Sequence, residues 1–252
     1  MKNAAVAFIF ALVLALPLAQ AYTDHSLSVT VTVQKDGTAH IREKTIFYVD
    51  NDAEIEAFKD NLKLGKSTIL AWKKFSDNIR YHIGGVQSPV DNLTITAGPE
   101  YDIKQNARSV TLDYDLVDLF VATQKVGSRT LLCTLNEEIL GFDKSETRQT
   151  ILGSNVYFTI TLPQTASLVK KDGAVQVGPS PYVYDVSNRT ITWFGPSTGR
   201  WVLQYEVEEP LSDEVFGFFS DLYDNLVELL PLAVLLLSTI IILTMLIKMK
   251  RI

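Results

Sequence analysis

Residues 26–49, SLSVTVTVQKDGTAHIREKTIFYV, decide the fold class of this chain. In the first half, serine and threonine alternate with apolar residues, namely Leu27, Val29, Val31 and Val33. This period of two is typical of a strand with one buried face. Residues 35–38, Lys-Asp-Gly-Thr, supply a hairpin turn, and residues 39–49 return as a second strand. The stretch therefore predicts a β-hairpin that packs on a hydrophobic core.

Short β-branched segments interrupted by glycine and proline follow at 92–97, 109–115, 157–162 and 174–177. Residues 190–194 and 200–207 flank a Gly-Pro-Ser-Thr-Gly loop and predict a final hairpin. Many short strands separated by turn residues favour a mainly β fold, a β-sandwich-like ectodomain. The polar segment 144–148 suggests a boundary near residue 150. The sequence is therefore compatible with a single ectodomain or with two subdomains divided there.

A small helical insertion is expected between residues 52 and 80. Asp50, Asn51 and Asp52 can cap a helix in which apolar residues recur at spacings of three and four, namely Ile55, Phe58 and Leu62. A second short helix is expected from Ser67, with Ile69, Trp72 and Phe75 on one side.

Residues 229–247 are an uncharged run of 19 residues and predict a transmembrane helix. At ~1.5 Å per residue the run spans ~28 Å, close to a hydrocarbon core of ~30 Å. A buried core helix is the alternative. Lys248, Lys250 and Arg251 follow at once, so the positive-inside rule places the tail, residues 248–252, in the cytoplasm.

The amino terminus has the order of a secretory signal peptide, residues 1–21. Lys2 precedes an apolar stretch at 4–16, and Ala19-Gln20-Ala21 resembles a cleavage site, with cleavage after Ala21. An uncleaved signal anchor is the alternative. Together the two apolar segments predict a single-pass type I protein of the cell membrane, with residues 22–209 outside the cell.

Residues 210–228 join the predicted ectodomain to the predicted span. Apolar residues recur there at helical spacing: Leu211, Val215, Phe219, Leu222 and Leu226. One interpretation is an amphipathic helix in the membrane interface. A stalk helix continuous with the span is favoured, because the polar residues are acidic rather than basic.

The predicted exported part is strongly acidic. Four of the 23 basic residues lie at the chain ends and none of the 29 acidic residues does, which leaves 19 basic residues and a net charge of −10 between 22 and 228. This surface repels nucleic acid and anionic lipid headgroups. The expected partners are the bilayer itself, a protein in or outside the membrane, or a glycan.

The sequence holds few candidates for catalysis or metal binding. Cys133 is the only cysteine, so no internal disulfide is expected and a buried thiol is favoured over a reactive one. His25, His40 and His82 lack the spacing of a zinc site. Asp113, Asp115 and Asp118 suggest a calcium site, but a solvated strand edge is favoured. We predict no catalytic, cofactor-binding or metal residue and no cofactor.

Two sequons, Asn92-Leu93-Thr94 and Asn188-Arg189-Thr190, lie in the predicted exported part. They fit the acceptor pattern for N-glycosylation. Asn92 and Asn188 are therefore candidate glycosylation sites.

Residues 26–49 and 189–210 resemble the first and last strands of uncharacterised archaeal and bacterial membrane proteins with an N-terminal extracytoplasmic β domain. The resemblance implies an extracytoplasmic β-sandwich, archaeal in origin given the short tail and acidic exterior. It implies no catalytic residue.

The leading functional hypothesis is a binding module that serves as an accessory or scaffold subunit of a cell-envelope assembly. The first alternative is a membrane-anchored envelope hydrolase whose site is assembled from scattered residues, since triads come from distant positions. A cavity holding a histidine beside a carboxylate would favour it. The second alternative is a surface-layer or adhesion component.

Overall fold

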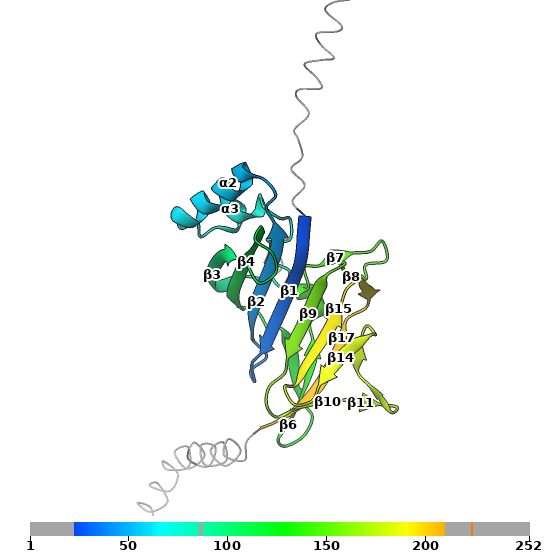
Figure 1. Ribbon diagram of the computed structural model, residues 1–252. Helices are drawn as coiled ribbons and strands as arrows, with labels where there is room; N and C mark the ends of the chain where they lie inside the picture. The colour runs from blue at the N-terminus through cyan, green and yellow to red at the C-terminus, as the bar shows by residue number, and fades with distance from the viewer. Residues whose placement is uncertain (1–22, 86–87, 210–222, 224–252) are drawn as a thin grey trace, which may run out of the picture.

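The computed structural model describes residues 23–85, 88–209 and Tyr223 (Figure 1). The predicted signal peptide with its cleavage site at Ala21, the span at 229–247 and the tail at 248–252 lie outside these residues. The predicted helix at 210–228 does so too, apart from Tyr223. No helix in the described ranges is both long and apolar enough to cross a membrane.

The fold is mainly β, with several sheets and a small helical insertion, which confirms the coarse prediction. The largest sheet has seven strands in the spatial order β14 (Tyr182–Asp185), β15 (Thr190–Phe194), β9 (Val156–Thr161), β1 (Thr23–Val33), β2 (Ala39–Tyr48), β4 (Ala107–Leu116) and β3 (Val90–Pro99). A five-stranded sheet contains β10 (Ala166–Leu168), β17 (Val202–Glu208), β6 (Thr130–Leu135) and β5 (Val121–Lys125), with β13 (Val177–Gly178) paired to β17. Smaller sheets are formed by β16 (Ser197–Gly199), β8 (Thr150–Leu152) and β7 (Asp143–Lys144), and by β11 (Lys170–Lys171) and β12 (Ala174–Val175).

The first hairpin forms as predicted. Strands β1 and β2 are antiparallel with Val33 opposite Ala39, and Asp36 accepts a hydrogen bond from the Thr38 amide at 3.0 Å. Gly37 has a φ of +90°, and a Cβ there would lie 2.8 Å from the Val121 carbonyl oxygen. Glycine fits this turn because the backbone conformation and the close approach both exclude a side chain.

The predicted final hairpin is wrong. β15 pairs with β9 and β14 in the large sheet, whereas β17 pairs with β6, β10 and β13. The chain between them forms β16, which pairs with β8, so it crosses from one sheet to another. Alternation of apolar residues determines which face of a strand is buried, but it does not determine the partner strand. The predicted strand at 174–177 likewise divides into β12 and β13.

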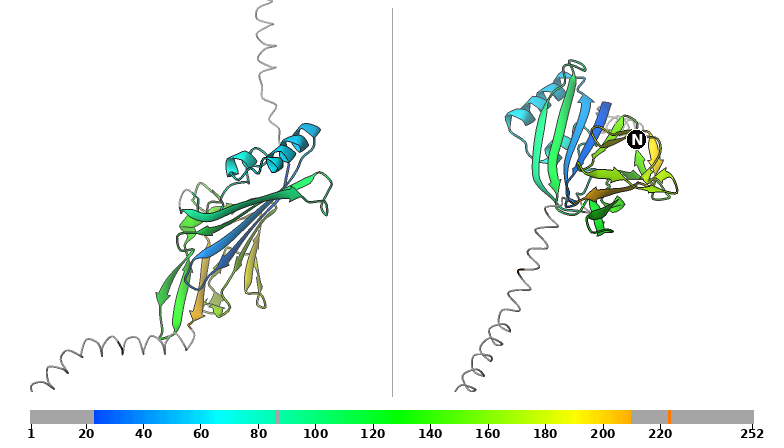
Figure 2. Two further views of the ribbon diagram at one scale, coloured as in Figure 1. Left: turned by 90° about the vertical axis from the view of Figure 1, so that its left-hand side faces the viewer. Right: turned by 90° about the horizontal axis from the view of Figure 1, so that it is seen from below.

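The core lies between the large sheet and the sheet that contains β17. Phe158 and Trp193 on the large sheet contact the ring of Trp201, which immediately precedes β17, at centroid distances of 5.2 and 4.8 Å. Figure 2 shows these two groups of strands around a common interior. Because β1 pairs in parallel with β9, strands from both sides of residue 150 share this sheet and core.

The helical insertion covers one end of the sheet beside β2 and β4 (Figure 1). In α2 (Asp52–Lys63), the Asn51 side chain accepts from the Glu54 amide at 2.9 Å, and Glu54 accepts from the Asp50 amide at 2.9 Å. This reciprocal cap is the reason the helix begins here. α3 (Ile69–Lys73) follows as a single short helix.

The insertion packs through aromatic rings. Phe58 of α2 contacts Phe47 of β2 and Phe75, and it also contacts Trp72 of α3. Of the apolar residues that fall at helical spacing, Phe58 is buried, whereas 39% of Leu62 is exposed. It lies one turn beyond the aromatic cluster.

Candidate functional site

The chain that follows α3 runs along the buried face of β2. Three contacts mark its course: Phe75 stacks on Phe47, the Thr45 hydroxyl donates to the Asn78 carbonyl at 3.2 Å, and His82 meets Glu43. This segment is not a strand, and the buried amides of His82 and Ile83 do not donate to the carbonyl of a neighbouring strand. Buried amides require hydrogen-bond acceptors, and β2 must provide one.

Glu43 is that acceptor. It sits at an inward position of β2 between Ile41 and Thr45, and only 1% of it is exposed. Oε1 accepts from the backbone amides of His82 at 2.8 Å and Ile83 at 3.3 Å, and from the hydroxyl of Tyr114. Oε2 bonds to Nδ1 of His82 at 2.7 Å. A carboxylate only accepts hydrogen bonds, so Nδ1 is the donor in this fourth bond.

Tyr114 completes the network from β4. Its hydroxyl also bonds to the Ile83 carbonyl oxygen at 2.8 Å, and burial followed by the charge of Glu43 raises its pKa far above the ordinary value. The tyrosine is therefore a neutral hydrogen-bond donor. Glu43, His82 and Tyr114 together form what we call the buried clamp, since they fix residues 82 and 83 on the sheet.

The buried clamp supports a second backbone connection. The His82 carbonyl oxygen accepts from the Gly141 amide at 2.7 Å, and the Gly84 amide donates to the Ile139 carbonyl oxygen at 2.8 Å. Ile83 and Leu140 form an isolated antiparallel bridge, and the His82 ring packs on Phe142 at 5.3 Å. The clamp thus positions residues 139–142.

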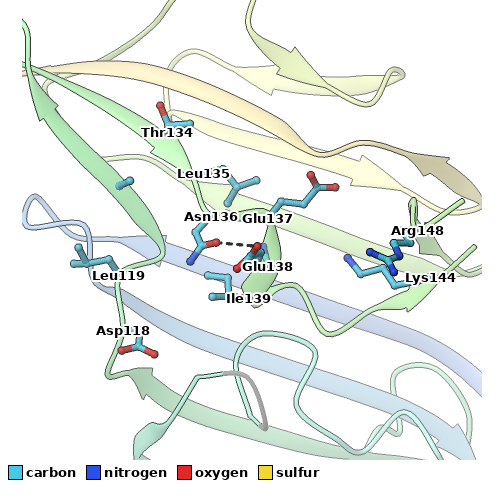
Figure 3. Close-up of a pocket in the computed structure, with 11 residues that line it drawn as sticks. Asp118, Leu119, Thr134, Leu135, Asn136, Glu137, Glu138, Ile139, Lys144 and Arg148 are labelled. Atoms are coloured by element: carbon cyan, nitrogen blue, oxygen red, sulfur yellow. Dashed lines mark hydrogen bonds between the residues drawn. The ribbon is translucent and has the colours of Figure 1, made fainter.

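Residues 137–139 form the short helix η1 (Glu137–Ile139), which is one wall of a groove (Figure 3). The groove has a volume of about 1230 Å³. Its lining comes from four places in the chain: the loop before β5, the strands β5 and β6, η1, and the β7–β8 hairpin. The lining residues are Asp118, Leu119, Ala122, Thr134, Leu135, Asn136, Glu137, Glu138, Ile139, Lys144 and Arg148.

Charges of opposite sign are separated along the groove. Figure 3 shows Asp118 at one end, Lys144 and Arg148 at the other, and the two glutamates between them. The carboxylate of Glu137 already has two partners: Oε1 accepts from the Trp201 amide at 3.2 Å, and Oε2 lies 3.7 Å from Nε of Arg200. Lys144 donates to the Thr150 hydroxyl at 2.5 Å.

Neither Lys144 nor Arg148 forms an ion pair with any residue in the described ranges. Arg148 is presented by a tight turn in which its amide donates to the Ser145 carbonyl oxygen at 2.9 Å, and the Gln149 amide donates to the Ser145 hydroxyl at 3.0 Å. The groove therefore offers two cations without an acidic partner, held on a hydrogen-bonded turn, in a chain that is acidic overall.

The three histidines have three different environments, and none of them lines the groove. His25 bonds to the Tyr48 hydroxyl at 2.9 Å, and His82 belongs to the buried clamp. His40 lies on the outer face of β2, where Nε2 is 2.8 Å from Asp113 and Nδ1 is 2.7 Å from Asp115.

The suggested calcium ligands do not come together. Asp113 and Asp115 share the outer face of β4, but their oxygens are engaged by His40, by Arg42 at 2.7 Å and by Asn92 at 2.8 Å. Asp118 instead lines the groove. In residues 23–85 and 88–209, no group of three histidine, cysteine or acidic side chains is arranged to hold a metal ion.

The hydrogen bonds to Asp115 affect its titration. Donation from Asn92, followed by donation from His40, lowers the pKa of Asp115 below its ordinary value of 3.8. The charged form is therefore the one that the fold stabilises.

Cys133 is buried on the inward face of β6, opposite Tyr205 of β17. Burial raises the pKa of its thiol, which keeps it protonated at neutral pH. The environment fits the predicted packing role.

Both sequon asparagines are exposed, and each side-chain amide donates to a neighbouring carboxylate. Asn92 lies in the edge strand β3 and bonds to Asp115 at 2.8 Å, while Asn188 lies in the β14–β15 turn and bonds to Asp185 at 2.8 Å. Glycosylation at either position stays a prediction.

The buried clamp was missed from sequence, although a signal was present. Glu43 falls at an inward position of a strand whose other inward residues are Ala39, Ile41, Thr45 and Phe47. A charge at such a position requires a buried partner, so it should have been matched with His82 or a tyrosine.

No protein-family model matches the chain, and no curated protein matches it.

Proposed function

We propose that the chain is a single-pass type I membrane protein whose exported β-sandwich acts by binding, as an accessory or scaffold subunit of a cell-envelope assembly. The groove carries the proposal, because two cations without acidic partners face it from a hydrogen-bonded turn. Membrane attachment and export rest on the two apolar segments of the sequence.

The occupant that fits this groove is a segment of a partner protein. Lys144 and Arg148 at one end would pair with acidic side chains or a carboxyl terminus, and Asp118 at the other would attract a basic residue. Leu119, which is 45% exposed, supplies apolar contact beside Asp118. A groove of alternating charge and apolar surface selects a peptide of matching pattern, since a misplaced like charge costs affinity.

The test is affinity purification of the tagged full chain from its native membranes in mild detergent, followed by mass spectrometry. A multi-span protein in stoichiometric amount is expected. The double charge reversal Lys144→Glu/Arg148→Glu should remove it, because both groove cations become anions.

The matched control is Lys170→Glu/Lys171→Glu, which makes the same change of charge at two exposed positions of β11. Loss of the partner in the control as well would show a nonspecific charge effect and contradict the groove as its site. A monomer without a companion would overturn the accessory-subunit function.

The hydrolase alternative required a cavity that holds a histidine beside a carboxylate. Glu43 orients the His82 imidazole through Nδ1, as in the general base of a hydrolase. Only 2% of the His82 side chain is exposed, however, and no histidine lines the groove. The described residues therefore meet only half of that requirement.

A further inference from the structure

The outer face of the large sheet carries a regular array of hydroxyl groups on β15, β9 and β1. These strands lie side by side (Figure 1), and their registers align Thr192, Thr159 and Thr30 in one row. Thr190, Thr161 and Thr32 form the next row. Because strands lie ~4.8 Å apart and alternate residues ~6.7 Å apart, the six hydroxyls form a grid.

Two aromatic rings extend this grid by a third row. Phe194, Tyr157 and Ser28 are aligned in the same registers. The rings of Phe194 and Tyr157 meet edge to face at 5.7 Å, and 45% and 41% of these residues are exposed. We call these nine residues the hydroxyl array.

The hydroxyl array belongs to the solvent side of the sheet and not to the core. The residues between its members, such as Val31, Phe158 and Ile191, are fully buried on the opposite face. The array contains no charged residue, whereas the adjoining strands β2 and β4 present His40, Arg42 and Asp113 on the same outer face. A neutral patch is thus bounded by a charged one.

This chemistry selects among ligand classes. The hydroxyls of Thr159 and Thr192 bond to each other at 3.0 Å. An apolar protein or lipid surface would leave the other threonine hydroxyls unpaired, and each buried unpaired hydroxyl costs free energy. A neutral polyhydroxyl ligand offers a donor and an acceptor at every position. The apolar C–H face of a sugar ring also stacks on an exposed aromatic ring.

We propose that the hydroxyl array binds a neutral glycan chain, with sugar rings against Tyr157 and Phe194 and their hydroxyls on the threonine rows. This inference rests on the proposed export of the chain, since glycans lie outside the cell. It concerns a surface separate from the groove, and its residues come from other strands.

The test is titration of the full chain with neutral oligosaccharides, including maltoheptaose, cellohexaose, chitohexaose and a mannohexaose. The detergent must lack a sugar headgroup, since an alkyl maltoside would compete. Binding of at least one oligosaccharide is expected, with a dissociation constant that is insensitive to sodium chloride because no charge is involved.

The variant Tyr157→Ala/Phe194→Ala should weaken this binding at least tenfold. The control Tyr101→Ala removes an aromatic residue that is also exposed but lies outside the array, and it should leave binding unchanged. Thr159→Val/Thr192→Val should weaken binding severalfold, because it removes two hydroxyls while preserving side-chain shape and strand preference.

Three results would overturn the proposal: no binding to any of the four oligosaccharides, equal binding by the Tyr157→Ala/Phe194→Ala variant, or self-association of the chain that this variant abolishes. The last would assign the face to a second copy. The groove variant Lys144→Glu/Arg148→Glu should retain glycan binding, so failure of the groove proposal and failure of this one are distinguishable.

Discussion

Replacement of Glu43 by alanine should destabilise the fold severely. The change removes a carboxylate that accepts four hydrogen bonds. It leaves the amides of His82 and Ile83 and the imidazole without that acceptor in the core, while the Tyr114 hydroxyl keeps its bond to the Ile83 carbonyl oxygen. Each buried donor that loses its acceptor costs about 1–3 kcal/mol, so three such donors should cost at least about 3 kcal/mol. That is a large part of the ~5–15 kcal/mol by which folded domains are stable.

The assay is urea unfolding of the full chain in detergent, followed by tryptophan fluorescence. Trp72, Trp193 and Trp201 are all buried, so the signal reports on both the insertion and the main core. The control is Glu56→Ala on α2, whose side chain is 60% exposed and pairs only with Lys59 in the described structure. It should change the free energy of unfolding by less than about 0.5 kcal/mol.

A second substitution, Glu43→Met, removes the charge but keeps an apolar side chain of similar size, so it tests whether the backbone amides need the carboxylate as an acceptor. Replacing both partners of a buried hydrogen bond by apolar groups of the same shape can be nearly neutral. Glu43→Met should nevertheless remain destabilised, because the His82 and Ile83 amides still lack an acceptor. A typical hydrogen bond contributes about 1 kcal/mol to stability. If the free energy of unfolding of Glu43→Met lies within about 1 kcal/mol of that of the parent chain, the account of the buried clamp is wrong.

Three further predictions concern other parts of the fold. Phe58→Ala should cost about 3–5 kcal/mol in urea unfolding because the ring is buried among aromatics. Leu62→Ala, one turn further along the same side of the helix but 39% exposed, should cost less than about 1 kcal/mol; equal costs would contradict the packing of α2. The lowered pKa of Asp115 contributes stability above its unfolded pKa of 3.8 that is lost as pH falls through the lower folded value. When the pH falls from about 5 to about 2.5, the urea midpoint should therefore fall more for the parent chain than for Asp115→Asn. Parallel curves of urea midpoint against pH for the two proteins would refute the lowered pKa of Asp115. Cys133 should react with a thiol reagent only after denaturation, since it is buried and protonated; labelling of the native chain at the rate of a free thiol would contradict its position on β6.

The local pattern of the sequence predicts the strands well but not their partners. The alternation at residues 27–33 and the Asp-Gly turn specify the first hairpin because both strands and the turn lie within one short stretch. The strands at 190–194 and 202–208 have equally clear alternation, yet they belong to different sheets. Their partners β9 and β6 lie at least 29 and 67 residues away in the chain, and no local signal encodes that choice.

The candidate site was less accessible to prediction than the fold. The groove is built from loops and short strands between residues 118 and 148, whose side chains converge only after the sheets pack. The sequence suggests Asp118 as a calcium ligand with Asp113 and Asp115 but favours a solvated strand edge. In the structure Asp118 turns to the groove, because β4 ends at Leu116. Glu43 is the exception, since a charge at an inward strand position is visible in the sequence itself.

The most direct test of the binding function is site-specific photocrosslinking in native cells. Ala122 lines the groove and is exposed, so a photoreactive phenylalanine analogue there would face an occupant. We predict one reproducible crosslinked membrane protein from position 122, lost when Lys144 and Arg148 are reversed in charge, and none from Lys171. No crosslink at position 122, or the same products at position 171, would contradict the groove as the place where this protein binds its partner.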